Sequence, residues 1–154
     1  EMLNETDANT NSLMRSCKLL DAIVKSLGSV DLKTRKQIME SCGKACAKDD
    51  GDLAIAEEIG RTTENMTEIV ERINKELPWC GIWFLRGKTI ESICTKCGCP
   101  LVKSRAIDRN PTWCLCSRGW VKAVFEAALK RRVEIDLNKS MGLGDEVCLF
   151  VVHT

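Results

Sequence analysis

The chain has 154 residues, of which 44% are hydrophobic and 29% are charged, a balance typical of one folded domain with a sizeable core. Its apolar runs are far shorter than the roughly 20 residues that a membrane-spanning helix needs, and the N-terminal residues lack the pattern of a secretion signal. We therefore expect a cytoplasmic protein with no membrane partner, in which cysteine side chains stay reduced.

Charge is distributed unevenly along the chain, although the net charge is only +1. Residues 1–77 carry 11 basic and 15 acidic side chains, whereas residues 78–154 carry 12 and 7. The basic half has no stripe of Lys and Arg interleaved with aromatic residues, which argues against a direct nucleic-acid interface.

The first half predicts a helical part over residues 12–77. Apolar residues recur every three or four positions from Leu13, and Cys17 lies on this stripe, which predicts that both face the core. A second helix is expected to begin at the N-cap Asp31, and two further helices are expected to end at Gly60 and before Pro78. Thr62 or Thr63 is the expected cap of the last one.

Cys42 and Cys46 lie one turn apart on the second predicted helix, so their side chains share a face. Two thiols so placed can bind a metal, form a redox pair or simply pack. Gly43 between them weakens a helix by about 1 kcal/mol relative to Ala, which predicts that the backbone bends or is closely approached here. We expect at least one of the two sulfurs to lie near a cysteine outside this helix, either Cys80 or one of those in 94–116.

The second half, residues 78–154, predicts an α+β arrangement. Residues 79–85 and 89–93 read as a hairpin, Ser117 is the expected cap of a helix, and residues 133–138 alternate between apolar and polar types, as a half-buried strand does. A last strand over 147–152 is expected to pair antiparallel with it. The fold class is therefore α+β, in which N-terminal helices pack on a small antiparallel sheet and residues 1–154 form a single domain.

Five of the ten cysteines gather between residues 94 and 116, in a pattern typical of a metal loop. Thiols one or two residues apart can turn toward one point, and two such pairs offer the tetrahedral set of ligands that zinc prefers. A pair with one residue between is poorly suited to an internal disulfide. Zinc is the expected cofactor, an iron–sulfur cluster is the alternative, and buried or oxidised thiols are the third reading. The expected ligands are Cys97, Cys99, Cys114 and Cys116, with Cys94 in reserve.

The C-terminal part resembles the 4-vinyl reductase domain, a module that commonly senses small molecules in regulatory proteins. The residues that carry the resemblance are Cys116-Ser117-Arg118-Gly119-Trp120, Phe125-Glu126, Val133-Glu134-Ile135, Ser140, Gly144-Asp145 and Cys148-Leu149-Phe150. The chain is also similar to uncharacterised cysteine-rich proteins of anaerobic microbes and, more weakly, to the 2-aminothiazoline-carboxylate hydrolase family.

In the aromatic-sensing members of the 4-vinyl reductase domain, three cysteines and a glutamate hold a structural zinc. The resemblance places Cys116 and Cys148 at the first and last of these ligands, but Ser140 and Leu137 stand where the third cysteine and the glutamate would be. The site cannot be rebuilt unchanged, so the resemblance implies replacement ligands from the paired cysteines.

The first functional hypothesis is a metal-binding sensor of a small-molecule ligand or of redox state, with a homodimer as a further expectation. Its ligand pocket is expected to be lined by tryptophan side chains, because apolar walls with few polar groups suit small ligands. These residues are Trp79, Trp83, Trp113 and Trp120.

Two other functions stay open. A hydrolase acting on a small thiazoline-like or amide substrate would need a base, for which the chain offers the single histidine, His153, expected in a disordered tail, and the carboxylates Glu91 and Glu126. Four thiolates leave no open position for a metal-bound water, so we predict no catalytic residue and favour a protein that is not an enzyme. The third hypothesis is an iron–sulfur redox protein.

Overall fold

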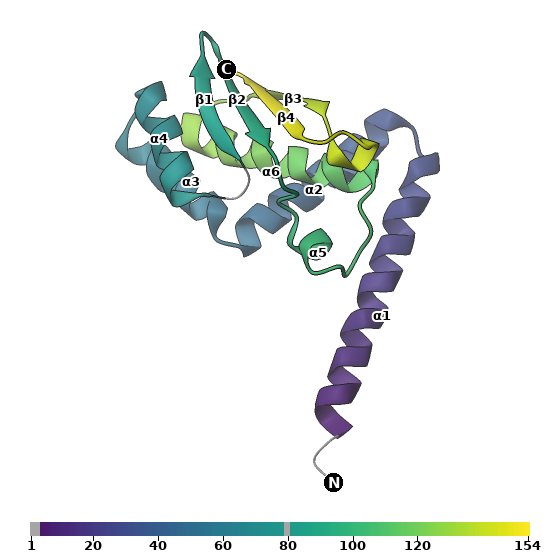
Figure 1. Cartoon of the computed structure of the whole chain (residues 1–154). Helices are drawn as coiled ribbons and strands as arrows, with labels where there is room; N and C mark the ends of the chain where they lie inside the picture. Colours follow the sequence, from purple (N-terminus) through teal and green to yellow (C-terminus); the bar gives the residue numbers. More distant parts are fainter. Residues whose placement is uncertain (1–3, 79–80) are drawn as a thin grey trace.

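The computed structural model describes residues 4–78 and 81–154, and it describes side chains from residue 10 on. Trp79 and Cys80 lie outside the described residues. Four helices come first, and a four-stranded sheet with one long helix follows, as the α+β prediction required (Figure 1). In chain order the elements are α1 (Asn4–Ser26), the short 3-10 helix η1 (Leu27–Ser29), α2 (Leu32–Asp49), α3 (Asp52–Thr62), α4 (Met66–Glu76), β1 (Ile82–Arg86), β2 (Thr89–Cys94), α5 (Pro100–Lys103), α6 (Pro111–Leu129), β3 (Glu134–Lys139), the 3-10 helix η2 (Met141–Leu143) and β4 (Cys148–His153).

The sheet has the strand order β1-β2-β4-β3, and every neighbouring pair is antiparallel. Both predicted strand pairs are confirmed, and β4 joins them by pairing with β2. Ile90 lies opposite Val152, and Cys94 lies opposite Cys148. Because side chains alternate along a strand, these four share the buried face of the sheet.

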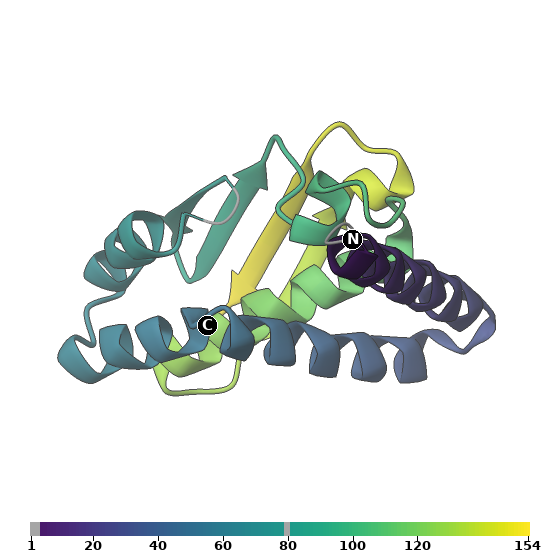
Figure 2. The ribbon, with the colours of Figure 1, turned by 90° about the horizontal axis from the view of Figure 1, so that it is seen from below.

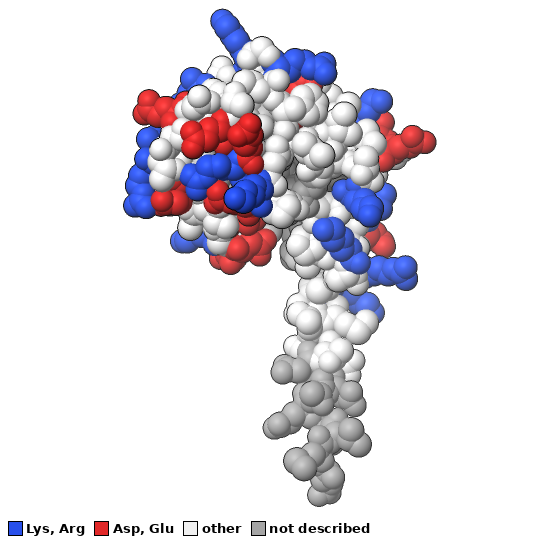
Figure 3. Space-filling model, turned by 60° about the vertical axis from the view of Figure 1, so that its left-hand side comes forward, with Lys and Arg blue, Asp and Glu red and all other residues white. Residues whose placement is uncertain are grey.

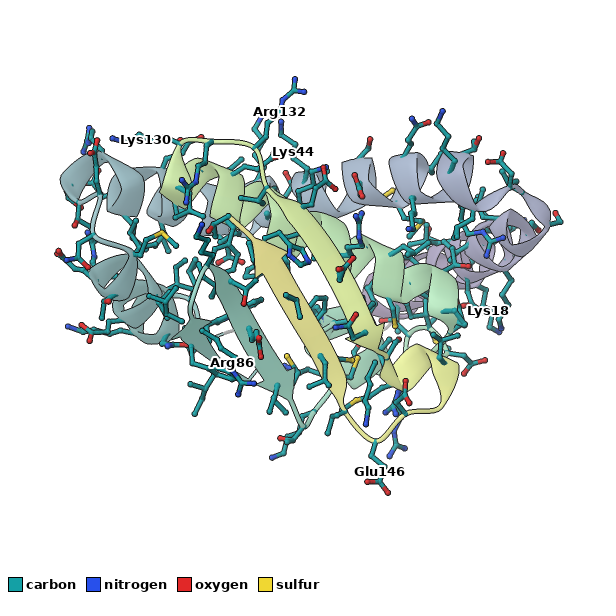
Figure 4. All side chains as sticks on the ribbon, turned by 90° about the horizontal axis from the view of Figure 1, so that it is seen from above. Lys18, Lys44, Arg86, Lys130, Arg132 and Glu146 are labelled. Carbon is teal, nitrogen blue, oxygen red and sulfur yellow. The ribbon has the colours of Figure 1, made fainter. Side chains whose placement is uncertain are left out.

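The buried face of the sheet packs on α6, which is the centre of the main core. Three side chains of α6 are essentially inaccessible to solvent, those of Trp120, Val124 and Phe125. The Phe125 ring packs edge-on against the Trp83 ring, with 4.7 Å between the ring centroids. Helices α2 and α3 cover the other side of α6, and Figure 2 shows α2 running alongside it. Figure 4 shows the opposite face of the sheet with no described helix in front of it.

Glycines allow the helices to approach α6 closely. A Cβ atom on Gly43 would lie 2.1 Å from the carbonyl oxygen of Cys116, so the predicted close approach is present. A Cβ atom on Gly60 would lie 2.6 Å from the carbonyl oxygen of Ala128. The prediction that Gly60 ends a helix is wrong, because α3 continues to Thr62. Gly60 instead lies inside α3, where it contacts the backbone of α6.

Helix α1 differs most from the sequence-based expectation. It begins at Asn4, well before Leu13, and it extends away from the rest of the chain in Figure 1. Leu13 is 67% exposed and Leu20 is 39% exposed, whereas Val24 near the C-terminal end is buried. The apolar stripe of α1 therefore packs on the body only at its last turns, and Cys17 is half-buried rather than part of the core.

Two helices begin at asparagine caps that the sequence analysis did not select. The side chain of Asn65 accepts hydrogen bonds from the first turn of α4, and that of Asn110 does the same for α6. Pro111 follows Asn110 at the first helical position, where its missing N–H costs nothing. Helix α6 thus begins six residues before the predicted cap Ser117, and Trp113, Cys114 and Cys116 lie inside it. The predicted cap Asp31 is confirmed for α2.

The C-terminal end is part of the sheet. His153 lies in β4, and its Nε2 atom is 2.8 Å from Oδ2 of Asp136 on β3, so the expected disordered tail is wrong. Acidic and basic side chains intermingle on the face of the molecule seen in Figure 3. Among the described residues, no helix is both long enough and apolar enough to cross a bilayer.

Candidate metal centre

The start of α6 divides the cysteines of the predicted metal loop into two sets. Successive residues of an α-helix are turned by about 100°, so Cys114 and Cys116 point to nearly opposite sides of α6. Cys114 faces η2 and the sheet, and Cys116 faces α2. The expected set of Cys97, Cys99, Cys114 and Cys116 is therefore not brought to one point.

Eight of the cysteines form two groups of four. The sheet-side group consists of Cys94, Cys97, Cys114 and Cys148. The helix-side group consists of Cys42, Cys46, Cys99 and Cys116, and Cys99 also interacts with Cys114 of the sheet-side group.

The sheet-side group lines one small cavity between β2, β4, η2 and the start of α6. Cys94 and Cys148 are partners on neighbouring antiparallel strands, which places their Cα atoms about 5 Å apart. Cys114 reaches the cavity from α6, and a Cβ atom on Gly142 would lie 2.5 Å from its sulfur. Cys97 closes the cavity from the loop after β2. Residues from four separate segments thus place their thiols around one space.

The size of this cavity restricts what it can hold. Its volume is about 20 Å³, close to the minimum that one water molecule needs. An organic ligand does not fit in such a space, whereas a single metal ion does. The basic residues Lys96 and Arg109 also line the cavity and can offset the negative charge of bound thiolates.

Hydrogen-bond donors surround two of the sheet-side sulfurs. The backbone N–H of Met141 donates to Sγ of Cys148 at 3.4 Å. Burial raises the pKa of Cys114, while hydrogen bonds from the Ser140 hydroxyl and the Gly142 N–H oppose that rise. Burial also raises the pKa of Cys148, and the Met141 N–H opposes it. These donors favour the thiolate form that a metal requires.

The helix-side group lies where α2 crosses α6. Cys42 and Cys46 flank the point at which Gly43 meets the backbone of Cys116, and Sγ of Cys46 donates to Oδ2 of Asp50 at 3.6 Å. Burial, and then the charge of Asp50, raises the pKa of Cys46 to about 11. Cys42 and Cys46 both interact electrostatically with Cys116, and Cys46 also interacts with Cys99, so the cysteines outside their helix that act on them belong to the predicted range 94–116.

In neither group do the cysteine side chains converge as metal ligands. Within residues 4–78 and 81–154, no three His, Cys, Asp or Glu side chains are arranged as metal ligands.

The described tryptophans of the expected ligand pocket, and the residues considered as a possible acid or base, do not line the sheet-side cavity. Trp83 and Trp120 belong to the main core, and Trp113 belongs to a smaller cluster with Val24, Met39 and Ile107. The indole N–H of Trp120 donates to Asp52 at 3.0 Å. Of the expected acids and bases, His153 pairs with Asp136, Glu91 pairs with Arg86, and Glu126 accepts a hydrogen bond from the Val133 N–H.

Sequence reasoning missed the polar surroundings of the sheet-side sulfurs. Ser140 is 1% exposed, its hydroxyl accepts a hydrogen bond from the Gly142 N–H, and its backbone N–H donates to Asp145. The signal in the sequence was the short run from Ser140 to Asp145, because glycines and an aspartate after a strand predict a tight turn with inward-pointing N–H groups.

The fold and the site define an α+β protein in which helices and an antiparallel sheet surround neighbouring groups of thiols. The chain belongs to DUF6144, a family of unknown function whose model matches residues 4–154. No curated protein matches the sequence.

Proposed function

We propose that this protein is a metal-binding domain and that the sheet-side group binds zinc. Cys97, Cys114 and Cys148 supply three thiolates, and Cys94, opposite Cys148 in the sheet, stands at the fourth side of the cavity. The observation that carries the proposal is the convergence of these thiols, from the end of β2 and the loop after it, from α6 and from β4, on a cavity with room for an ion.

The bound metal would join the loop after β2 to the sheet and to α6. That loop has little secondary structure of its own, apart from the single turn of α5. Zinc bound by residues of β4, α6 and the loop would make their docking part of the folding free energy, which is how structural zinc sites stabilise small domains.

The resemblance to the 4-vinyl reductase domain supports the choice of ligands. Ser140 stands where aromatic-sensing members of that domain carry a cysteine ligand, and here it donates a hydrogen bond to Cys114. Cys114 thus offers a thiolate next to the position from which the usual ligand is missing. A sensing role for the site, of a small molecule or of redox state, is part of the proposal.

Metal analysis of the anaerobically purified chain tests the proposal. We expect zinc in the wild-type protein, and less zinc in Cys97→Ser and Cys148→Ser after exchange against a chelator. Cys17→Ser is the matched control, because Cys17 lies on α1 outside both groups. Removing zinc should also lower the thermal midpoint, since binding free energy adds to folding free energy.

Two results would contradict the zinc site. Equal zinc in wild type, Cys97→Ser and Cys148→Ser would show that the sheet-side group does not bind it. A brown protein that contains iron and acid-labile sulfide would instead favour the iron–sulfur alternative, which uses the same thiolates.

A further inference from the structure

The thiols of the helix-side group gather where α2 packs on α6. Cys42 and Cys46 lie one helical turn apart on α2, so both thiols face the same direction. Between them, Gly43 lies so close to α6 that a Cβ atom on it would be 2.1 Å from the carbonyl oxygen of Cys116 and 2.4 Å from the backbone nitrogen of Trp120. The backbones of α2 and α6 are therefore held together at the level of the three thiols.

The segment before α5 brings the fourth thiol to this crossing. Leu101 and Val102 of α5 pack in the smaller core cluster, and Cys116 packs against the same cluster. Cys99 immediately precedes Pro100, the first residue of α5, so the docking of α5 fixes its position. Cys116 interacts electrostatically with Cys46, Cys42 and Cys99, so the four side chains occupy one neighbourhood at this crossing.

The two groups are separate because of the pitch of α6. A single ion cannot be bound by both Cys114 and Cys116, since they point to nearly opposite sides of the same helix. The sheet-side cavity has four cysteines of its own, and the helix side has three together with Cys99, which lies near both sides. Tetrahedral coordination by four thiolates is the usual arrangement of a structural zinc site.

We propose that Cys42, Cys46, Cys99 and Cys116 form a second zinc site, which fastens α2 to α6 and to the segment before α5. Binding replaces four thiol protons by one divalent ion, and the protons pass to water, so the step needs no oxidant or reductant. The inference uses the same metal as the proposed function but none of the same ligands, and the two can be tested apart.

The test counts metal in the full chain, purified anaerobically, loaded with zinc and exchanged against a chelator. We expect about two zinc ions per chain in the wild type and about one in Cys46→Ser, Cys116→Ser or Cys148→Ser. The double variant Cys46→Ser/Cys148→Ser should retain almost none, and Cys17→Ser should match the wild type. Because Cys116 is packed and its replacement can disturb folding, Cys42→Ser at the exposed position of the group gives the same comparison with less risk.

Cobalt provides a second readout that does not depend on stoichiometry alone. Co²⁺ loaded at two tetrathiolate sites should lose about half of its thiolate-to-metal charge-transfer absorption in Cys46→Ser, and about half in Cys148→Ser. Equal losses support two separate sites with similar ligands.

The outcomes separate the two proposals. Wild-type zinc content in Cys42→Ser, Cys46→Ser and Cys116→Ser would overturn the second site, whatever Cys148→Ser does. Loss of zinc in those variants, with no loss in Cys148→Ser, would support the second site and contradict the sheet-side one. A Cys46–Cys116 disulfide in the chain purified without oxidant, found by mass spectrometry of tryptic peptides, would also overturn it.

Discussion

Gly43 on α2 lies against the carbonyl oxygen of Cys116 on α6, at a distance that leaves no room for a side chain. Elsewhere in a helix, Ala is favoured over Gly by about 1 kcal/mol. At this crossing, however, a Cβ atom would meet backbone atoms of Cys116, Gly119 and Trp120, which cannot move aside like the end of a long side chain. The stability gained from this close packing of α2 on α6 therefore exceeds the helix propensity lost by having Gly rather than Ala at position 43.

We predict that Gly43→Ala destabilises the protein by about 1–3 kcal/mol, as overpacking of a tight interface does. Chemical denaturation measured by circular dichroism gives the free energy of unfolding. Gly28→Ala is the matched control, because no atom lies within 4 Å of a Cβ atom built there, and it should be neutral. Equal stability of Gly43→Ala and wild type would show that α2 and α6 lie further apart.

Much of the fold could be read from the sequence, because periodicity depends only on local order. The alternation in β3 and the hairpin of β1 and β2 gave the right strands. The stripe of α1 was misjudged, since a 3.6-residue period shows that a face is apolar but not whether another element covers it. The cysteine spacing predicts an extended loop up to Ser117, whereas α6 already begins at Pro111, for which Asn110-Pro111 is a recognisable start signal.

The cysteines themselves were identifiable as candidates, but their grouping was not. Cys94 and Cys148 meet only because β2 pairs with β4 in one register, and a strand register over 53 residues of intervening chain has no local signal. Cys114 and Cys116 separate because they lie in a helix. The close approach at Gly43 was predictable, since a glycine in mid-helix needs a reason.

Arg118 connects three elements from a nearly buried position. Its Nε atom donates to the carbonyl oxygen of Ile135 on β3 at 2.8 Å, and its guanidinium pairs with Glu40 on α2. Removing one partner of a buried ion pair leaves the other without compensation, at about 3–5 kcal/mol. The loss here should fall at the lower end, because Glu40 is 25% exposed and keeps Lys122 at 3.7 Å.

Arg118→Ala should therefore lower the free energy of unfolding by about 3 kcal/mol. Arg132→Ala is the control for the loss of one positive charge, since Arg132 is exposed and points away from the body in Figure 4. Similar small losses in both variants would mean that the pair with Glu40 contributes little.

Asp31 caps α2 and makes stability depend on pH. Hydrogen bonds from the Thr34 side chain and backbone N–H hold the pKa of Asp31 below its ordinary value of 3.8. Because the folded state lowers this pKa, the charged cap contributes its full stability above pH 3.8 and loses it as the pH falls through the lower folded value.

We predict that Asp31→Ala is less stable than wild type at neutral pH and that the difference narrows in acid, where the wild-type carboxylate is protonated. Asp31→Asn keeps a cap acceptor without the charge, so its stability should change less with pH. Thermal melts from pH 2 to pH 7 measure both. A gap between Asp31→Ala and wild type that stays constant down to the lowest pH would contradict the role of the charge.

The exposed part of α1 should be dispensable for the fold. Residues 10–16 are all exposed, so a chain that begins at Cys17 loses no buried side chain among those described, and its free energy of unfolding should change by no more than about 0.5 kcal/mol. Val24, which is 3% exposed in the smaller core cluster, provides the contrast. Val24→Ala removes two buried carbon groups at about 0.8 kcal/mol each and should cost about 1.5 kcal/mol or more. If the deletion destabilised the chain more than Val24→Ala does, the N-terminal turns of α1 would have to pack against the body.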